Sequence, residues 1–125
     1  AERLKGGYAF QQLLNQNGWL PLGTDFPVEE INPFKTFLAA VARQDAKGFP
    51  AGGFQMENAL TREQTIRGMT IWAAKANRME KQVGSIEVGK KADFILLDKD
   101  LMKVPTDSIL QIKVLKTYSN GERVH

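Results

Sequence analysis

The chain of 125 residues contains no cysteine and a single histidine, His125, at its last position. Without cysteine the chain can form no disulfide, thiolate zinc site or cysteine nucleophile. The absence of cysteine does not indicate whether the protein works in an oxidising or a reducing compartment. One histidine excludes a His-x-His pair, a His-Glu-x-x-His helix and a serine–histidine triad built from this chain alone. Any hydrolytic chemistry in which the chain takes part is therefore expected to use residues outside it.

Long hydrophobic runs are also absent. No apolar stretch approaches the ~20 residues that span a bilayer, so we expect no membrane partner. Residues 1–5 lack the pattern of a signal peptide, which favours a cytoplasmic location and leaves open an export signal upstream of Ala1. The formal net charge is +3, but Lys90-Lys91 is the only adjacent basic pair. Because nucleic-acid surfaces cluster basic residues beside aromatic ones, we expect no nucleic-acid partner.

Apolar residues at helical spacing predict three helices, over residues 1–17, 33–41 and 61–78. The pair Gly6-Gly7 weakens the first turn of the first helix by about 1 kcal/mol per glycine. The pair Asn17-Gly18 is typical of a helix end, and Pro33 suits the first position of a helix. The sequence Thr61-Arg62-Glu63-Gln64 fits a capping box and predicts that the third helix begins there. Its expected core face consists of Ile66, Met69, Thr70, Ala73 and Ala76.

Apolar segments between the helices and after them predict strands. The short run Trp19-Leu20-Pro21-Leu22 is the first, and the continuous run Phe94–Leu97 is typical of a strand covered on both faces. Near the end, residues 114–119 followed by Asn120-Gly121 predict a hairpin with a two-residue turn. The order is helix, strand, helix, helix and then a small set of strands, which indicates an α/β fold.

Two residues are candidates for chemistry on position alone. Asp25 follows a predicted buried strand, where α/β enzymes place catalytic groups, but taken alone it is better explained as a turn or helix-capping aspartate. Arg43, near the end of the second predicted helix, is either an anion contact or a cation matched to the helix dipole. Spacing alone favours the structural explanation for both residues.

A glycine-rich segment leads into the strand Phe94–Leu97. The glycines of residues 84–93 supply tight turns, and Ile86 is expected to fill a small core. The pattern Gly-x-x-x-x-Gly-Lys also resembles part of a phosphate loop. However, Lys91 stands where that loop has Ser or Thr, and a strand follows where the loop leads into a helix. We therefore interpret the segment as structural.

Four segments in this order resemble the carboxyl-terminal region of metal-dependent amidohydrolases, in the branch of N-substituted formamide deformylase-like proteins. The resemblance covers residues 8–124. Because four motifs occur in the family's order, the resemblance is more specific than any single motif. The motifs are Gly23-Thr24-Asp25-Phe26-Pro27-Val28, Ala39-Ala40-Val41-Ala42-Arg43, Leu60-Thr61-Arg62-Glu63-Gln64 and residues 84–98.

The resemblance implies the terminal portion of a distorted (β/α)8 TIM barrel together with the carboxyl-terminal strands of its small β-sandwich. Residues 1–82 would form the last βα units of the barrel, with residues 20–23 as its eighth strand, and residues 83–125 would supply the sandwich strands. A complete barrel needs ~250 residues. The sequence is therefore expected to be a fragment of a longer hydrolase.

The same resemblance implies that Asp25 contacts a divalent metal, in the first place zinc, and accepts a proton from the attacking water. Phe26 and Pro27 would shape the loop beside the metal, and Arg43 would support that loop or meet the substrate. The family's His-x-His, its carboxylate or carboxylated lysine and its middle-strand histidines have no counterpart here. Because catalytic zinc usually has three protein ligands, we expect the isolated chain to bind no metal and to be inactive.

The parent protein is then expected to hydrolyse a non-peptide, amide-like C–N bond of a small substrate through metal-activated water. An alternative from a different class is an autonomous, non-catalytic binding or assembly domain. A truncated barrel would expose strand edges and apolar helix faces. We therefore expect self-association, through strand pairing or through the faces of residues 34–38 and 66–73.

Overall fold

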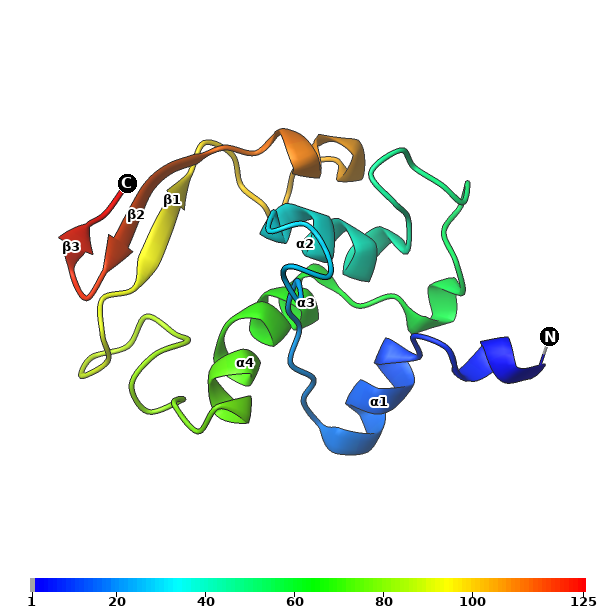
Figure 1. Cartoon of the computed structure of the whole chain (residues 1–125), viewed down its shortest axis with the longest axis horizontal. Helices are drawn as coiled ribbons and strands as arrows, with labels where there is room; N and C mark the ends of the chain where they lie inside the picture. The colour runs from blue at the N-terminus through cyan, green and yellow to red at the C-terminus, as the bar shows by residue number, and fades with distance from the viewer. Residues whose placement is uncertain (1) are drawn as a thin grey trace.

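The computed structural model describes residues 2–125, which form a helical body and a small sheet at one end (Figure 1). The two chain ends lie at opposite ends of the molecule. None of the helices within residues 2–125 combines the length and the apolar character that a membrane span requires. The fold is thus mixed α/β, as the sequence predicts.

The first two helices follow the local signals in the sequence. After the 3-10 turn η1 (Glu2–Gly6), α1 (Phe10–Asn17) ends at Gly18, whose φ of 76° is left-handed and whose N–H donates to the Leu14 carbonyl. The helix α2 (Pro33–Ala42) begins after Asn32, whose side chain accepts a hydrogen bond from the Phe34 N–H at 3.0 Å. The predicted end of the first helix and the predicted start of the second are confirmed. The first helix does not extend back through residues 7–9 as predicted, because residues 7 and 8 form a turn.

The third predicted helix is divided into α3 (Arg62–Met69) and α4 (Ile71–Ala76). Both halves of the capping box are present, because the Gln64 N–H donates to the Thr61 hydroxyl and the Thr61 N–H to the Gln64 side chain. The division falls at Thr70, with φ −125° and ψ −94°, whose hydroxyl donates to the Ile66 carbonyl at 2.6 Å. Such back-bonding bends helices. Thr70 and Ala76 are exposed, so their prediction as core residues is wrong.

The predicted strand over residues 19–22 is also wrong, because this segment is irregular. The Leu22 N–H donates to the Gly68 carbonyl of α3 at 2.9 Å. A strand needs a neighbouring strand to share its ladder. The sheet lies at one end of the molecule and away from this segment (Figure 1), so Leu20 and Leu22 pack against helices without strand hydrogen bonds.

The sheet is antiparallel and consists of β1 (Phe94–Leu97), β2 (Val114–Ser119) and β3 (Glu122–Arg123), in the order β1-β2-β3. Ser119 pairs with Glu122, and the turn residues Asn120 and Gly121 have φ values of 51° and 85°. Two left-handed residues are what a tight hairpin turn of this kind needs. The predicted hairpin is confirmed.

The strand β1 is not covered on both faces, contrary to the prediction. Ile95 is 48% exposed and Leu96 is 43% exposed, and these neighbours point to opposite faces of the sheet. The sheet is a single layer at the end of the described chain (Figure 1), so nothing within this chain covers both of its faces. The strand also lies at the sheet edge, because only β2 pairs with it.

The main core lies between α2 and the 3-10 segment η3 (Thr106–Gln111). Phe37 and Ile109 are fully buried there, and Phe34 and Leu38 are nearly so. The helix face of residues 34–38 is therefore buried within the chain, which contradicts its expected role in self-association. Ile86 is 84% exposed, so it does not fill a core as expected. Its loop closes through a hydrogen bond from the Lys91 N–H to the Gln82 carbonyl, and this leaves the Ile86 side chain outside.

Candidate functional site

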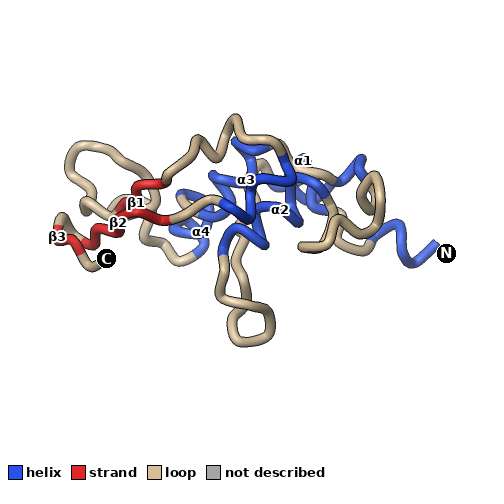
Figure 2. The backbone as a smooth tube through the Cα atoms, turned by 90° about the horizontal axis from the view of Figure 1, so that it is seen from above, coloured by secondary structure: helices blue, strands red, loops and turns tan. Residues whose placement is uncertain are grey.

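Asp25 lies in the loop of residues 23–32, which leads into α2 and projects away from the helices (Figure 2). The Val28 N–H donates to the Asp25 carbonyl at 2.8 Å, and the Phe26 N–H donates to the Thr24 hydroxyl at 3.3 Å. Asp25 itself has a φ of 53°. Aspartate is one of the few residues apart from glycine that adopts this region readily. The loop therefore holds Asp25 in a defined turn through backbone bonds.

The carboxylate of Asp25 has no structural task in the described chain. The side chain is exposed, and no hydrogen bond or salt bridge within residues 4–125 involves its oxygens. The cap of the following helix is Asn32. The explanation of Asp25 as a turn residue is confirmed and its explanation as a helix cap is wrong, and no group of the described chain occupies its carboxylate.

Phe26 and Pro27 share the loop with Asp25 and are likewise exposed. Phe26 is 60% exposed, and the peptide bond between it and Pro27 is cis. Two further apolar residues of the loop, Val28 and Ile31, are 77% and 70% exposed. Val28 ends the motif of residues 23–28 and Ile31 follows it, but the sequence pattern predicted a role for neither side chain.

Arg43 lies apart from the Asp25 turn, at the end of α2, and only 7% of its surface is exposed. Its Nε donates to the Phe54 carbonyl at 2.9 Å, and its guanidinium carbon lies 5.2 Å from the centre of the Phe10 ring and 5.7 Å from that of Phe54. Burial lowers the pKa of the guanidinium, whereas the negative charge of Glu57 raises it. Arg43 thus anchors the loop of residues 44–54 in the described structure.

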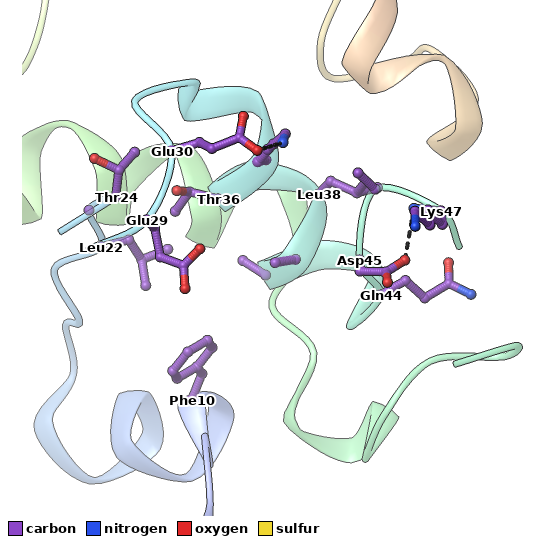
Figure 3. Close-up of a pocket in the computed structure, with 15 residues that line it drawn as sticks. Phe10, Leu22, Thr24, Glu29, Glu30, Thr36, Leu38, Gln44, Asp45 and Lys47 are labelled. Atoms are coloured by element: carbon purple, nitrogen blue, oxygen red, sulfur yellow. Dashed lines mark hydrogen bonds and ion pairs between the residues drawn. The ribbon is translucent and has the colours of Figure 1, made fainter. Parts of the chain in front are cut away.

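A cavity of about 510 Å³ opens between α1, α2 and the start of the Asp25 loop (Figure 3). Its volume is within the range of small-ligand sites. Gly23 and Thr24 line it, but Asp25 does not. Apolar side chains from α1, α2 and the irregular segment between them meet charged side chains there, namely Phe10, Leu38 and Leu22 with Glu29, Glu30, Lys35, Asp45 and Lys47.

The residues present do not complete a metal centre. Within residues 2–125 no group of three or more His, Cys, Asp or Glu side chains comes together in a way that could hold a metal ion. A catalytic zinc site has three protein ligands. Asp25 therefore supplies at most one of the three ligands that such a site needs.

The glycine-rich segment after α4 is held by its own side chains. The Lys90 ammonium donates to the Ser85 hydroxyl at 2.5 Å and lies 3.2 Å from the Glu87 carboxylate. The Asp93 carboxylate accepts a hydrogen bond from the Asn120 N–H at 2.6 Å, which ties the segment to the hairpin. The lysine that a phosphate loop would present to a ligand is thus occupied within the loop.

The whole chain, residues 1–125, matches the sequence model of the Amidohydrolase family. The chain therefore belongs to the amidohydrolase family, which confirms the family indicated by the four motifs. No solved structure gives a significant match to the chain.

Curated relatives resemble most of the length of the chain. It is 33% identical over 98% of its length to Protein LONG AFTER FAR-RED 3 of Arabidopsis thaliana. It is 30% identical over 91% of its length to N-substituted formamide deformylase of Arthrobacter pascens. It is 34% identical over 78% of its length to 5-methylthioadenosine/S-adenosylhomocysteine deaminase of Thermoanaerobacter pseudethanolicus. These matches cover 20%, 20% and 22% of the relatives, so the chain spans about a fifth of their length.

Proposed function

We propose that the chain is the carboxyl-terminal part of a metal-dependent amidohydrolase that hydrolyses a non-peptide C–N bond of a small, amide-like substrate. Family membership supports the proposal, as do the names of two relatives, a deformylase and a deaminase, which describe reactions at carbon–nitrogen bonds. The chain covers a fifth of those relatives, so the rest of a longer protein would provide the missing ligands.

The observation that carries the proposal is the free carboxylate of Asp25. It is exposed on a turn that backbone hydrogen bonds define, and no residue of the described chain holds its oxygens. A divalent metal, for which zinc is our first choice, lowers the pKa of a bound water towards ~7. In the longer protein Asp25 would contact that metal and take the proton of the water, with Phe26 and Pro27 shaping the loop beside it.

We further propose the division of the fold into residues 1–82, the last βα units of a (β/α)8 barrel, and residues 83–125, strands of a β-sandwich. The distribution of elements supports it, because α1 to α4 all precede residue 83 and β1 to β3 all follow it (Figure 1).

The test uses the longer protein that contains this chain, purified with Zn²⁺ and assayed for amine release from N-substituted formamides and acetamides. Asp25→Asn is expected to lower kcat about 10²- to 10⁴-fold, the range for loss of a general base. The matched control is Asp107→Asn, because Asp107 is an exposed aspartate of η3. Wild-type kcat in Asp25→Asn would contradict the proposal, as would full activity of the isolated 125-residue chain.

A further inference from the structure

The turn between β2 and β3 contains a chemically reactive pair, Asn120-Gly121. Asparagine is a thermolabile residue. The backbone nitrogen of the residue that follows it can attack its side-chain amide, and a glycine at that position has no Cβ to hinder the attack. The Asn120 side chain is exposed, and no hydrogen bond of the described residues holds its amide group. The side-chain carbonyl carbon is therefore free to move towards the Gly121 nitrogen.

The attacking nitrogen of the same pair is held by the segment that leads into β1. The Gly121 N–H donates to the Ala92 carbonyl at 2.9 Å, and the Asn120 N–H donates to the Asp93 carboxylate at 2.6 Å. The attack requires the Gly121 nitrogen to give up its proton and to leave its acceptor. The Asp93 carboxylate also opposes the negative charge that this deprotonation creates. The turn must therefore open from residues 92–93 before the pair reacts.

We propose that Asn120 is a site of deamidation and that the hydrogen bonds to Ala92 and Asp93 control its rate. In the reaction the Gly121 nitrogen loses its proton and forms a bond to the side-chain carbonyl carbon of Asn120, and the side-chain nitrogen leaves as ammonia. Water then opens the succinimide ring at either of its two carbonyls, which leaves aspartate or isoaspartate at position 120. Water is the only co-reactant.

The chain contains one other Asn-Gly pair, which provides an internal reference. Asn17 is the last residue of α1 and is exposed, and the Gly18 N–H donates to the Leu14 carbonyl of the same helix at 2.7 Å. This helix lies away from the hairpin (Figure 1). A change at Asp93 is therefore expected to alter the rate at Asn120 without altering the rate at Asn17.

The experiment incubates the longer protein that contains this chain at mildly alkaline pH and follows the mass increase of two tryptic peptides. Residues 117–123 contain Asn120, and residues 6–35 contain Asn17. A synthetic peptide of residues 117–123 gives the rate without the hydrogen bonds to Ala92 and Asp93. We expect Asn120 in the folded protein to react at least about tenfold more slowly than the peptide. A rate equal to that of the peptide would overturn the inference.

Two variants of Asp93 test the cause of the slow reaction. Asp93→Ala removes the acceptor and is expected to raise the rate at Asn120 about tenfold relative to Asn17, because a hydrogen bond to a charged group is lost. Asp93→Asn keeps an acceptor oxygen without the charge and is expected to raise that ratio about threefold. Asp107→Ala is the matched control, because Asp107 is an exposed aspartate away from the hairpin, and it is expected to leave the ratio unchanged.

The ratio of the two rates separates a local effect from unfolding. If Asp93→Ala unfolds the protein, both sites accelerate together, and the ratio in Asp93→Asn then decides. If neither variant of Asp93 changes the ratio, the inference is overturned.

Deamidation is also expected to keep the turn from binding residues 92–93 again. It places a second carboxylate near Asp93, and like charges repel. In Asn120→Asp, hydrogen exchange within residues 117–123 is expected to be about fivefold faster than in wild type. Asp93→Asn in the same chain is expected to reverse part of this increase, whereas unchanged exchange in Asn120→Asp would contradict this consequence.

Discussion

A Cβ atom added to Gly84 would lie 2.9 Å from the Cα of Ile71, at the break between α3 and α4. It would also lie 2.7 Å from the Cβ of Ala74, and Gly84 has a φ of 91°. The loop after α4 therefore packs directly against the helix break, and only glycine fits at this contact.

Gly84→Ala is expected to lower the free energy of unfolding by about 2–3 kcal/mol, through the close contact and the left-handed φ together. The matched control is Gly89→Ala, because Gly89 has a φ of 92° and no atom within 4 Å of an added Cβ. The control is expected to cost about 1 kcal/mol for backbone strain alone. Urea unfolding measures both, and equal losses would show that the contact with Ile71 contributes nothing.

Arg62 connects α3 to the segment before η3. Its two terminal nitrogens donate to the Leu101 carbonyl at 2.5 Å and the Val104 carbonyl at 2.6 Å. Arg62→Ala is expected to lower the free energy of unfolding by about 1–3 kcal/mol, because it leaves two partly buried carbonyls without a charged donor. Arg62→Lys is expected to recover less than half, since an ammonium lacks the planar fork of a guanidinium.

The control for Arg62 is Arg67→Ala on the same helix. Arg67 is exposed and forms an i,i+4 salt bridge with Glu63 at 2.9 Å, a kind of pair worth about 0.3–0.5 kcal/mol. Urea unfolding of the variants compares the two sites. A loss for Arg62→Ala as small as that for Arg67→Ala would contradict the bridging role.

The Asp45 carboxylate accepts hydrogen bonds from the loop after α2, and these bonds lower its pKa. It accepts hydrogen bonds from the N–H groups of Phe49 and Lys47 at 2.9 and 2.8 Å, and the bond from Phe49 is the largest effect that lowers its pKa. A lowered pKa means that the stabilisation is complete above the unfolded value of about 3.9 and is lost as the pH falls through the folded value.

An NMR titration of the Asp45 carboxyl measures this shift directly. Its midpoint is expected below the usual value of an aspartate, and the N–H signals of Lys47 and Phe49 are expected to move with the same midpoint. A midpoint for Asp45 at or above the usual value would show that these hydrogen bonds do not persist in solution.

We also propose that the isolated chain self-associates through the free edge of β1. The strand has one unpaired edge and exposes Ile95 and Leu96, which is typical of an edge that pairs with another chain. Sedimentation at tens of micromolar is expected to give a mass above 14.0 kDa. Ile95→Lys is expected to restore the monomer, because a charged side chain protects an edge strand.

Leu115→Lys is the matched control for this prediction. Leu115 is 53% exposed, but it lies on β2, the central strand of the sheet. The control is expected to leave self-association largely unchanged, because Leu115 does not lie on β1. A single monomeric species for the unmodified chain would exclude pairing through β1.

The predictions that are confirmed depend on short-range chemistry. A glycine after α1, Asn32 before Pro33, the capping box at Thr61 and the turn at Asn120 each satisfy backbone groups within a few residues. Such signals are complete in the sequence because donor and acceptor belong to the same local segment. The order of the four motifs along the chain was sufficient to indicate the amidohydrolase family.

The predictions that are wrong concern contacts between distant segments. The apolar run of residues 19–22 has the composition of a strand, but it has no strand partner among the described residues and packs against Gly68 instead. The helical spacing of apolar residues continues through Thr70, but the helix divides there. Gly84, which is distant in the sequence, packs against the helix at this division. Neither neighbour can be recognised from the local pattern.

The sequence alone determined the helix ends, the hairpin turn, the family and the candidate Asp25, because each depends on residue types at fixed local spacing. Only the tertiary structure decided that Asp25 has no capping role, that Arg43 anchors Phe54 and that the α2 face is buried. The physical reason is that burial and hydrogen-bond satisfaction are properties of neighbours in space, and residues far apart in the chain supply those neighbours.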